Sequence, residues 1–308
     1  MRKMLDLDLP GHPGPEITAD GARFALRAPM ARSATLCLFD ERDSELSSQE
    51  MEARDGGMFS TFVAGVKPGA RYGFRVDGPW EPEAGHRFDP SKLLVDPFAV
   101  RLDRPFSYAP ELAEFGADTR SMVPKAVLEA PLPPLNPGRP TFRPGGLVYE
   151  IPVRAFTLLH PGIPENERGT LRALAHPCII DHLSRLHVGA VELMPIAAWI
   201  DERHLPPLGL TNAWGYNPVT MLAPDPRLAP GGIADLRHAC EALHAAGIDV
   251  ILDVVFNHTG ESDIHGPTLS LRGLGNATYY RHDQHTPGML INDTGCGNTL
   301  ACDLPEVQ

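Results

Sequence analysis

The stretch GIDVILDVVFNHTGE, residues 247–261, runs from an apolar segment straight into a cluster of polar side chains. The apolar part is rich in Val, Ile and Leu, which is typical of a buried strand, and the polar part contains Asn257, His258 and Glu261. Ligands of parallel α/β proteins bind at the carboxyl ends of the strands. The stretch therefore predicts either a strand that leaves the core or a strand whose end delivers side chains to a site.

A regular alternation of strands and helices surrounds this stretch from residue 146 onward. Amphipathic helices are predicted at 176–186 and 231–247, and they separate three apolar strands at 147–153, 190–196 and 248–256. Strands that are apolar throughout and alternate with amphipathic helices indicate a parallel sheet that is buried on both faces.

The residues before this region follow the period of β-strands. Alternating apolar and polar side chains, with Pro and Gly between the runs, predict strands at 22–29, 34–40, 58–66 and 70–80. In the first of these strands Phe24 and Leu26 share one face. The pattern predicts an all-β sandwich over residues 1–110, followed by a linker over residues 111–145 that is rich in Pro, Gly and charge.

The composition excludes several classes of partner. The chain has 308 residues and a formal net charge of -12, and it contains no basic stretch that could follow a row of phosphates, so neither a nucleic acid nor a membrane is expected as a partner. No apolar run reaches the length of a membrane span, and the first residues lack the apolar core of a signal peptide. A soluble, cytoplasmic protein without a cofactor is predicted, and its oligomeric state is not indicated.

The cysteines do not form a recognisable motif. They are odd in number, and their spacings match no zinc site or redox pair: Cys37, Cys178, Cys240, Cys296 and Cys302. Cys178 and Cys240 lie among apolar residues of predicted helices, where a cysteine behaves as a small hydrophobe. Cys296 and Cys302 are close enough in sequence for a disulfide, but free thiols are expected in a reducing cytoplasm.

Aromatic residues gather in the loop after the second predicted strand, which contains Trp199, Trp214 and Tyr216. Flat aromatic rings with polar neighbours suit sugars, since sugar rings have apolar C–H faces and carry hydroxyls at their edges. Packing is favoured for Trp199 and for the pair Tyr279–Tyr280. Trp80 in the predicted sandwich fits either a surface platform for sugars or core packing.

Four potential metal ligands lie close together after the third predicted strand. They fall within residues 258–265 and are His258, Glu261, Asp263 and His265. A metal site needs ligands in a defined geometry, and irregular spacing on a loop provides none. No metal is therefore predicted.

Several blocks of the sequence resemble one enzyme family. DVVFNH (253–258) resembles the first conserved region of the α-amylase family of glycoside hydrolases. The isoamylase-like branch of that family is resembled by YEIPVRAFTLLHPGIPENERGT (149–170), GLTNAWGYNPV (209–219), LSLRGLGNATYY (269–280) and NDTGCGNTL (292–300). The segment from GARFALRAPMARSATLCLFD to RFDPSKLLVDPFAV, residues 21–100, resembles the glycogen-binding β-sandwich that precedes the barrel in this branch.

The resemblance implies roles for individual residues. Tyr216 matches the tyrosine that stacks on the sugar at the cleavage subsite, and His258 matches the histidine that hydrogen-bonds the hydroxyls of that sugar. Trp214 lines the same loop and is expected to bind substrate. Asp253 and Asn257 match positions that brace the site from the third strand.

The resemblance also implies what the chain lacks. Glycoside hydrolysis needs two carboxyl groups that flank the scissile bond. In the α-amylase family these groups follow the fourth and fifth barrel strands, so the nucleophilic Asp and the acid Glu are expected beyond the end of this chain, and no catalytic residue is assigned. Residues 146–308 are accordingly predicted to be a truncated (β/α)8 TIM barrel with about three β/α units.

The function implied by the resemblance is hydrolysis of α-1,6 branches in glycogen or limit dextrin, with retention in the complete enzyme. The 308-residue chain itself is expected to bind α-glucan weakly and to be inactive. An alternative from another class is a catalytically silent glucan-binding protein that uses residues 1–110. Within the family, an isoamylase or a trehalose-releasing relative is the second possibility.

Overall fold

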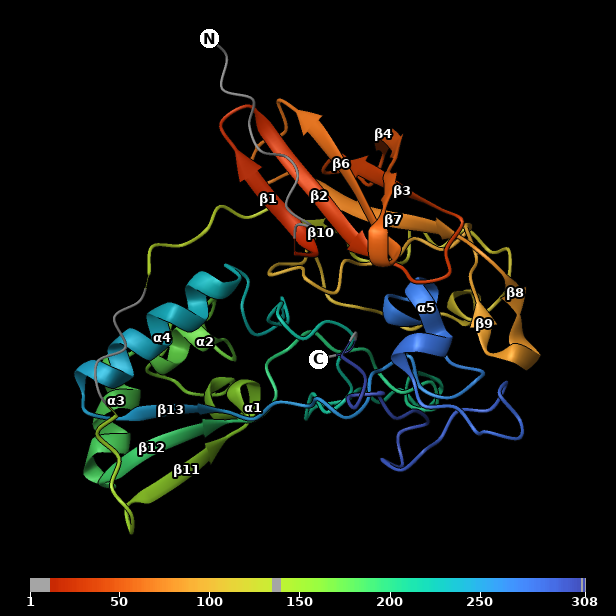
Figure 1. Ribbon diagram of the computed structural model, residues 1–308. Helices are drawn as coiled ribbons and strands as arrows, with labels where there is room; N and C mark the ends of the chain where they lie inside the picture. The colour runs from red at the N-terminus through yellow and green to blue at the C-terminus, as the bar shows by residue number, and fades with distance from the viewer. Residues whose placement is uncertain (1–11, 135–139, 306, 308) are drawn as a thin grey trace.

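The computed structural model describes residues 12–134, 140–305 and 307. Two antiparallel sheets form a sandwich at one end of the molecule (Figure 1). The first sheet has the order β1-β2-β6-β5 and contains β1 (Gly14–Thr18), β2 (Gly21–Arg27), β5 (Glu52–Arg54) and β6 (Met58–Ala64). The second has the order β10-β7-β3-β4 and contains β3 (Ser33–Phe39), β4 (Glu45–Glu50), β7 (Arg71–Asp77) and β10 (Ala126–Val127).

The core of the sandwich follows from the alternation of side chains along its strands. Phe24 and Leu26 of β2 are buried, as predicted, and the ring of Phe24 meets that of Tyr72 on β7 edge to face at 4.9 Å. β4 was not predicted, because its sequence ELSSQE is polar and all but its first residue are exposed. The β-sandwich predicted for this part of the chain is confirmed.

The segment predicted as a linker contributes to this sandwich. β10 pairs antiparallel with β7, and Val123 and Leu128 are buried in the sandwich core. The buried ammonium of Lys92 donates hydrogen bonds to three carbonyls of the same segment, those of Glu111, Glu114 and Ala117. The sandwich therefore continues past the predicted boundary at residue 110. The sequence did not reveal this because β10 is too short to show an alternating pattern.

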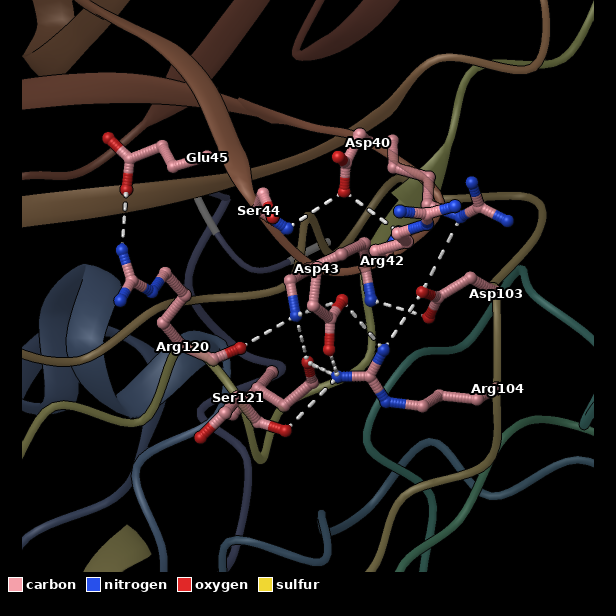
Figure 2. A network of polar contacts seen from close by, with 12 residues as sticks. Asp40, Arg42, Asp43, Ser44, Glu45, Asp103, Arg104, Arg120 and Ser121 are labelled. Carbon is pink, nitrogen blue, oxygen red and sulfur yellow. Dashed lines mark hydrogen bonds and ion pairs between the residues drawn. The ribbon is translucent and has the colours of Figure 1, made fainter.

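Ion pairs hold this segment against the turn between β3 and β4. Figure 2 shows the guanidinium of Arg104 between the carboxylates of Asp43 and Asp103. The ammonium of Lys125 is fully buried, 3.1 Å from Asp43 and over the ring of Phe39. Burial and the neighbouring Arg104 lower the pKa of Lys125. A buried cation is tolerated here because a carboxylate and backbone carbonyls surround it.

A three-stranded parallel sheet forms the other end of the molecule (Figure 1). Its order is β11-β12-β13, with β11 (Leu147–Ile151), β12 (Val188–Leu193) and β13 (Asp249–Leu252). The helices that follow or connect these strands are α1 (Val153–Thr157), α2 (Leu171–Leu174), α3 (Pro177–Arg185) and α4 (Ile233–Ala245). The strands are shorter than predicted; the first ends at Ile151 because Pro152 begins helix α1 as its N-cap.

Helices cover only one face of the parallel sheet. Tyr149, Val191 and Val250 are in register across the three strands and pack in one core with Ile179 and Leu183 of α3. The side chains one residue before and one residue after these three point to the opposite face of the sheet. There, Val148 and Ile251 are 38% and 41% exposed. The prediction that this sheet is buried on both faces is wrong for the described residues, since all the helices of this core lie on one side.

The chain returns from the parallel sheet to the sandwich through helix α5 (Leu271–Tyr279), which packs beside β9 (His86–Arg87) (Figure 1). The hydroxyl of Ser270 donates to the carbonyl of Val95 at 2.8 Å, and that of Tyr279 donates to the carbonyl of Arg27 at 3.1 Å. A Cβ at Gly273 would lie 2.4 Å from Leu94, so the close approach requires glycine. One hydrophobic core therefore joins the sandwich to the segment after β13.

The remaining elements are short. They are β8 (Trp80–Glu81), β9 (His86–Arg87), η1 (Asp55–Gly57), η2 (Pro82–Ala84), η3 (Pro110–Leu112) and η4 (Pro206–Leu208). None of the helices in the described ranges is long and apolar enough to cross a bilayer.

One ionisable group lies fully inside the sandwich. The carboxyl of Asp96 is 0% exposed, and it accepts hydrogen bonds from the hydroxyl of Tyr72 and the amide of Phe98, both at 2.8 Å. Burial raises the pKa of Asp96 to about 6, although both hydrogen bonds lower it. The folded protein therefore keeps this proton to a higher pH than the unfolded chain does.

We predict that Asp96→Asn removes a pH-dependent loss of stability. Between the ordinary pKa of 3.8 and about 6 the folded state binds more protons at Asp96, so stability falls as pH rises through this window. Relative to wild type, the variant should gain up to about 3 kcal/mol between pH 4 and pH 7, since two pKa units correspond to roughly this free energy. Urea unfolding at both pH values measures the difference, and an unchanged difference would contradict the prediction.

Candidate functional site

The candidate site lies where the parallel strands end. Asp253 follows β13 directly, and its amide donates to the carbonyl of Leu193 at 2.9 Å, which extends the pairing with β12. The long loop after β12 returns to this point through Tyr216 and Asn217. The carbonyl of Pro218 accepts from the amide of Gly260 at 2.7 Å. Backbone hydrogen bonds thus join the ends of two neighbouring strands, as the sequence predicted.

Tyr216 and Asp253 form the centre of the site. The hydroxyl of Tyr216 donates a hydrogen bond to the carboxylate of Asp253. This bond raises the pKa of Tyr216 to about 12, with smaller contributions from burial and from the charges of Asp253, Glu150 and Glu192. Glu150 and Glu192 are paired in register on the uncovered face of the sheet. The phenol therefore stays protonated and is held at the edge of that face.

His258 lies against the backbone of the same tyrosine. Its Nε2 is 2.9 Å from the carbonyl of Tyr216, and its Nδ1 is 2.7 Å from the side-chain amide of Asn257. The ring is 5% exposed, and this burial lowers the pKa of His258 against the opposing effect of the Tyr216 carbonyl. The atoms that face the two ring nitrogens, the side-chain oxygen of Asn257 and the carbonyl oxygen of Tyr216, are both acceptors, so the single N–H of a neutral ring donates to one of them. Both ring nitrogens therefore face polar atoms of the protein.

Trp214 stands beside Tyr216 and faces solvent. The indole is 68% exposed, and its ring meets that of Tyr216 edge to face at 6.5 Å. The side-chain oxygen of Asn212 accepts from the amides of Trp214 and Gly215, both at 2.9 Å. Gly215 has φ of 82°, and a Cβ there would lie 2.7 Å from the carbonyl of Pro195. The turn that presents Trp214 therefore needs both the asparagine and the glycine.

A small cavity opens next to this turn. Its volume is about 280 Å³, and its lining includes Trp214, Asn212, Arg154 and Arg227. Trp199 forms its floor and is 4% exposed, with the guanidinium of Arg227 over its ring at 3.9 Å. Trp199 is thus a packing residue, as the sequence indicated. An aromatic face, an amide and two guanidinium groups around a concave surface suit a polar ligand with an apolar face.

Three of the four side chains that first suggested a metal site, those of His258, Glu261 and Asp263, have partners within the protein. Glu261 is 1% exposed, and its carboxylate accepts from the amides of Leu269, Ser270 and Arg272 and from the hydroxyl of Tyr280, at 2.6–2.8 Å. Asp263 forms a bidentate ion pair with Arg203, with both distances 2.6 Å. Within the described ranges, no group of three His, Cys, Asp or Glu residues is arranged to hold a metal ion.

Asn298 secures the polar loop from the other side. Its side chain accepts from the amide of Thr259 at 3.0 Å and donates to the carbonyls of Thr259 and Ser262, both at 2.9 Å. The amide of Leu300 donates to the carbonyl of Asn257 at 2.9 Å. The end of the block NDTGCGNTL therefore has a structural role, because it hydrogen-bonds to the end of the block DVVFNH and to the residues that follow it.

The structure thus brings together every residue predicted for the site: Tyr216, His258, Trp214, Asp253 and Asn257. Their roles toward a sugar stay predictions. Sequence reasoning missed the supporting residues Glu261, Asn298 and Asn212, whose side chains hold backbone groups. The blocks that contain Asn298 and Asn212 were the available signal, but neither block shows which side chain binds the backbone.

Comparisons with known proteins now define the class of the chain. Residues 12–99 match the family carbohydrate-binding module 48 (isoamylase N-terminal domain), and they form the larger part of the sandwich. Among solved structures, the pullulanase type I from Bacillus subtilis str. 168 complexed with maltose has a TM-score of 0.70 at 23% identity and covers 98% of this chain and 40% of its own. The pullulanase from Anoxybacillus sp. LM18-11 complexed with maltotetraose has a TM-score of 0.71 at 24% identity, over 96% of this chain and 41% of its own. These two likenesses show the fold.

Curated relatives identify the chain more closely. It is 44% identical to the glycogen debranching enzyme of Yersinia enterocolitica over 300 residues, and this match covers 94% of the chain. It is 43% identical to the glycogen debranching enzyme of Enterobacter sp. (strain 638) over 306 residues, and this match covers 96% of the chain. The chain spans 45% and 46% of the length of these two relatives. It is therefore homologous to part of the glycogen debranching enzymes along almost its whole length, which confirms the resemblance seen in the sequence blocks.

We predict that Asp253→Asn lowers the pKa of Tyr216 from about 12 toward its ordinary value of 10.0, because a neutral amide stabilises the protonated phenol less than a carboxylate does. Carbon-13 NMR of ring-labelled tyrosine over pH measures this, with Tyr216→Phe identifying the resonance. Glu165→Gln is the control, since Glu165 is exposed. Titration of Tyr216 near pH 10 in the wild-type protein would contradict the prediction.

Proposed function

We propose that this chain is part of a glycoside hydrolase that cleaves α-1,6 branches in glycogen or limit dextrin with retention. In this proposal residues 146–308 form three β/α units of a (β/α)8 barrel, and the sandwich is its glucan-binding module. The observation that carries the proposal is the contact of Tyr216 with Asp253 and His258 at the carboxyl end of a parallel sheet, in a chain that is 44% identical to a debranching relative over 300 residues.

The tyrosine ring supplies a flat surface on which a glucose unit can stack. Asp253 fixes the ring through the hydroxyl, and His258 fixes the backbone of the same residue. Trp214 extends the aromatic surface toward solvent. A stacking surface held from two sides costs little reorganisation when the sugar binds, which favours productive orientation.

In this proposal the two carboxylates that break the bond belong to the part of the enzyme that corresponds to the unmatched part of the relatives. Support comes from β13, which pairs with β12 alone among the described strands. Beyond it Val254 and Phe256 are 50% and 62% exposed beside an apolar cavity of about 210 Å³. An unpaired strand edge flanked by exposed apolar side chains is the surface that a further barrel strand would cover.

We predict that the 308-residue chain releases no reducing sugar from phosphorylase limit dextrin. Fused to the remaining part of a debranching relative, it should hydrolyse limit dextrin, and Tyr216→Ala in the fusion should lower kcat/KM at least about 100-fold through loss of positioning. Phe62→Ala on β6, at a side chain that is 43% exposed, is the control and should leave the activity of the fusion unchanged. Hydrolysis by the chain alone, or full activity of the Tyr216→Ala fusion, would overturn the proposal.

A second function, glucan binding by the sandwich itself, is favoured by one surface feature. The ring of Trp80 on β8 lies 4.2 Å from that of Phe115 at an interplanar angle of 33°. The two side chains are 37% and 57% exposed. The sequence left Trp80 open between core packing and a sugar platform, and a stacked pair that faces solvent favours the platform.

We predict that Trp80→Ala weakens co-sedimentation of the chain with glycogen about tenfold or more, since loss of one stacking aromatic removes roughly 1.5 kcal/mol. Phe62→Ala removes an exposed aromatic from another strand and should leave binding unchanged. Trp214→Ala, compared in the same assay, separates binding at the strand ends from binding at the sandwich. Equal binding by wild type and Trp80→Ala would remove the basis for the platform.

A further inference from the structure

A thiol and two imidazoles meet at the start of helix α3, outside the site described above. His176 is the N-cap of α3 and Cys178 is the second residue of the helix. The Sγ atom of Cys178 lies 3.1 Å from Nδ1 of His176 and 3.8 Å from Nδ1 of His160, which is on the loop after α1. The sequence predicted a cysteine packed as a small hydrophobe, but all three side chains are partly exposed.

The hydrogen bonds around the two rings fix which nitrogens are acceptors. Nδ1 of His176 accepts from the amide of Cys178 at 3.5 Å, and Nδ1 of His160 accepts from the amide of Gly162 at 3.1 Å. Two unprotonated nitrogens therefore face the sulfur, and the thiol proton has His176 within hydrogen-bond reach. A nucleophile with a base at this distance is the arrangement that activates cysteine in thiol enzymes.

The backbone around the sulfur favours both the thiolate and access to it. Cys178 occupies the first turn of a nine-residue helix, where the amide groups and the helix dipole stabilise a negative charge. A Cβ at Gly162 would lie 3.2 Å from the ring of His160 and 3.8 Å from the sulfur of Cys178. The absence of a side chain at Gly162, which is exposed, leaves the sulfur open to a small reagent.

The other cysteines have different surroundings. None of the five forms a disulfide. Burial raises the pKa of Cys37 to about 11, and burial also raises the pKa values of Cys240 and Cys296. Cys302 is exposed, and its thiol donates to the carbonyl of Phe256 at 3.2 Å.

We propose that Cys178 is a peroxide-reactive thiol, with His176 as the base that takes its proton and hydrogen peroxide as the reactant. The proton moves from Sγ to Nδ1 of His176, and the sulfur then attacks one oxygen of the peroxide. The O–O bond breaks, an S–O bond forms, and the leaving hydroxide receives the proton from His176 as water. Sulfur is oxidised to sulfenic acid and the peroxide is reduced to water, so no further reactant is needed.

The test is treatment of the full chain with limiting hydrogen peroxide in the presence of dimedone, with peptide mass spectrometry to quantify each cysteine. Cys178 should be labelled at least about tenfold faster than Cys302 at pH 7, because His176 lies 3.1 Å from its sulfur and can take the thiol proton as the sulfur reacts. His176→Asn should lower that rate at least about tenfold, since asparagine remains a good N-cap but does not act as a base.

His238→Asn is the matched control, because His238 is exposed on α4 away from the thiol, and it should leave the rate unchanged. Circular dichroism of His176→Asn checks that the helix is retained. Equal labelling of Cys178 and Cys302, or an unchanged rate in a folded His176→Asn variant, would overturn the proposal.

Discussion

The arrangement of the candidate site depends on the hydrogen bonds that the buried carboxylate of Glu261 accepts. A carboxylate at 1% exposure is expensive to bury, and four donors offset that cost: three backbone amides before and within α5, and the hydroxyl of Tyr280. Because the same amides begin α5, the carboxylate fixes the helix to the loop that follows β13. Helix α5 in turn bonds to the sandwich through Ser270 and Tyr279. The loop with His258 is therefore anchored to the sandwich as well as to the parallel sheet.

This anchoring holds together a site that lies at the end of a narrow sheet. Three parallel strands with helices on one face do not enclose a site, and their second face stays open. Tyr216 is nevertheless held at its hydroxyl by Asp253 and at its backbone carbonyl by His258, and the ring of His258 is itself buried. Asn298 and the ion pair of Arg203 with Asp263 join the neighbouring loops. The rigidity comes from polar contacts between loops, with the sheet supplying the direction of the strands.

His258 illustrates how position in a motif and chemistry in the structure differ. The family resemblance implies a direct hydrogen bond from this ring to a sugar, whereas the structure gives both ring nitrogens protein partners. Contact with a sugar would exchange one of these partners, and the amide of Asn257 is the more exposed of the two. In the present arrangement the ring supports Tyr216, and Trp214 and Tyr216 present the surface that a ligand can reach.

The sequence by itself determined the two structural regions and the parallel strands, because apolar periods of two and 3.6 residues are local patterns. The residues of the candidate site came from the resemblance of the blocks DVVFNH and GLTNAWGYNPV to a family, and their roles stay predictions. Local patterns did not reveal the polar strand β4, the short strand β10 or the structural role of Glu261. Each of these depends on a pairing partner: β4 on its hairpin neighbour β3, β10 on the distant strand β7, and Glu261 on the amides at the start of α5. Cys178 was taken for a core residue for the same reason, since the imidazole of His160 reaches it only after the chain folds. Tertiary structure decided these features because a hydrogen bond or ion pair is specified by geometry between distant segments, which a period along the sequence does not contain.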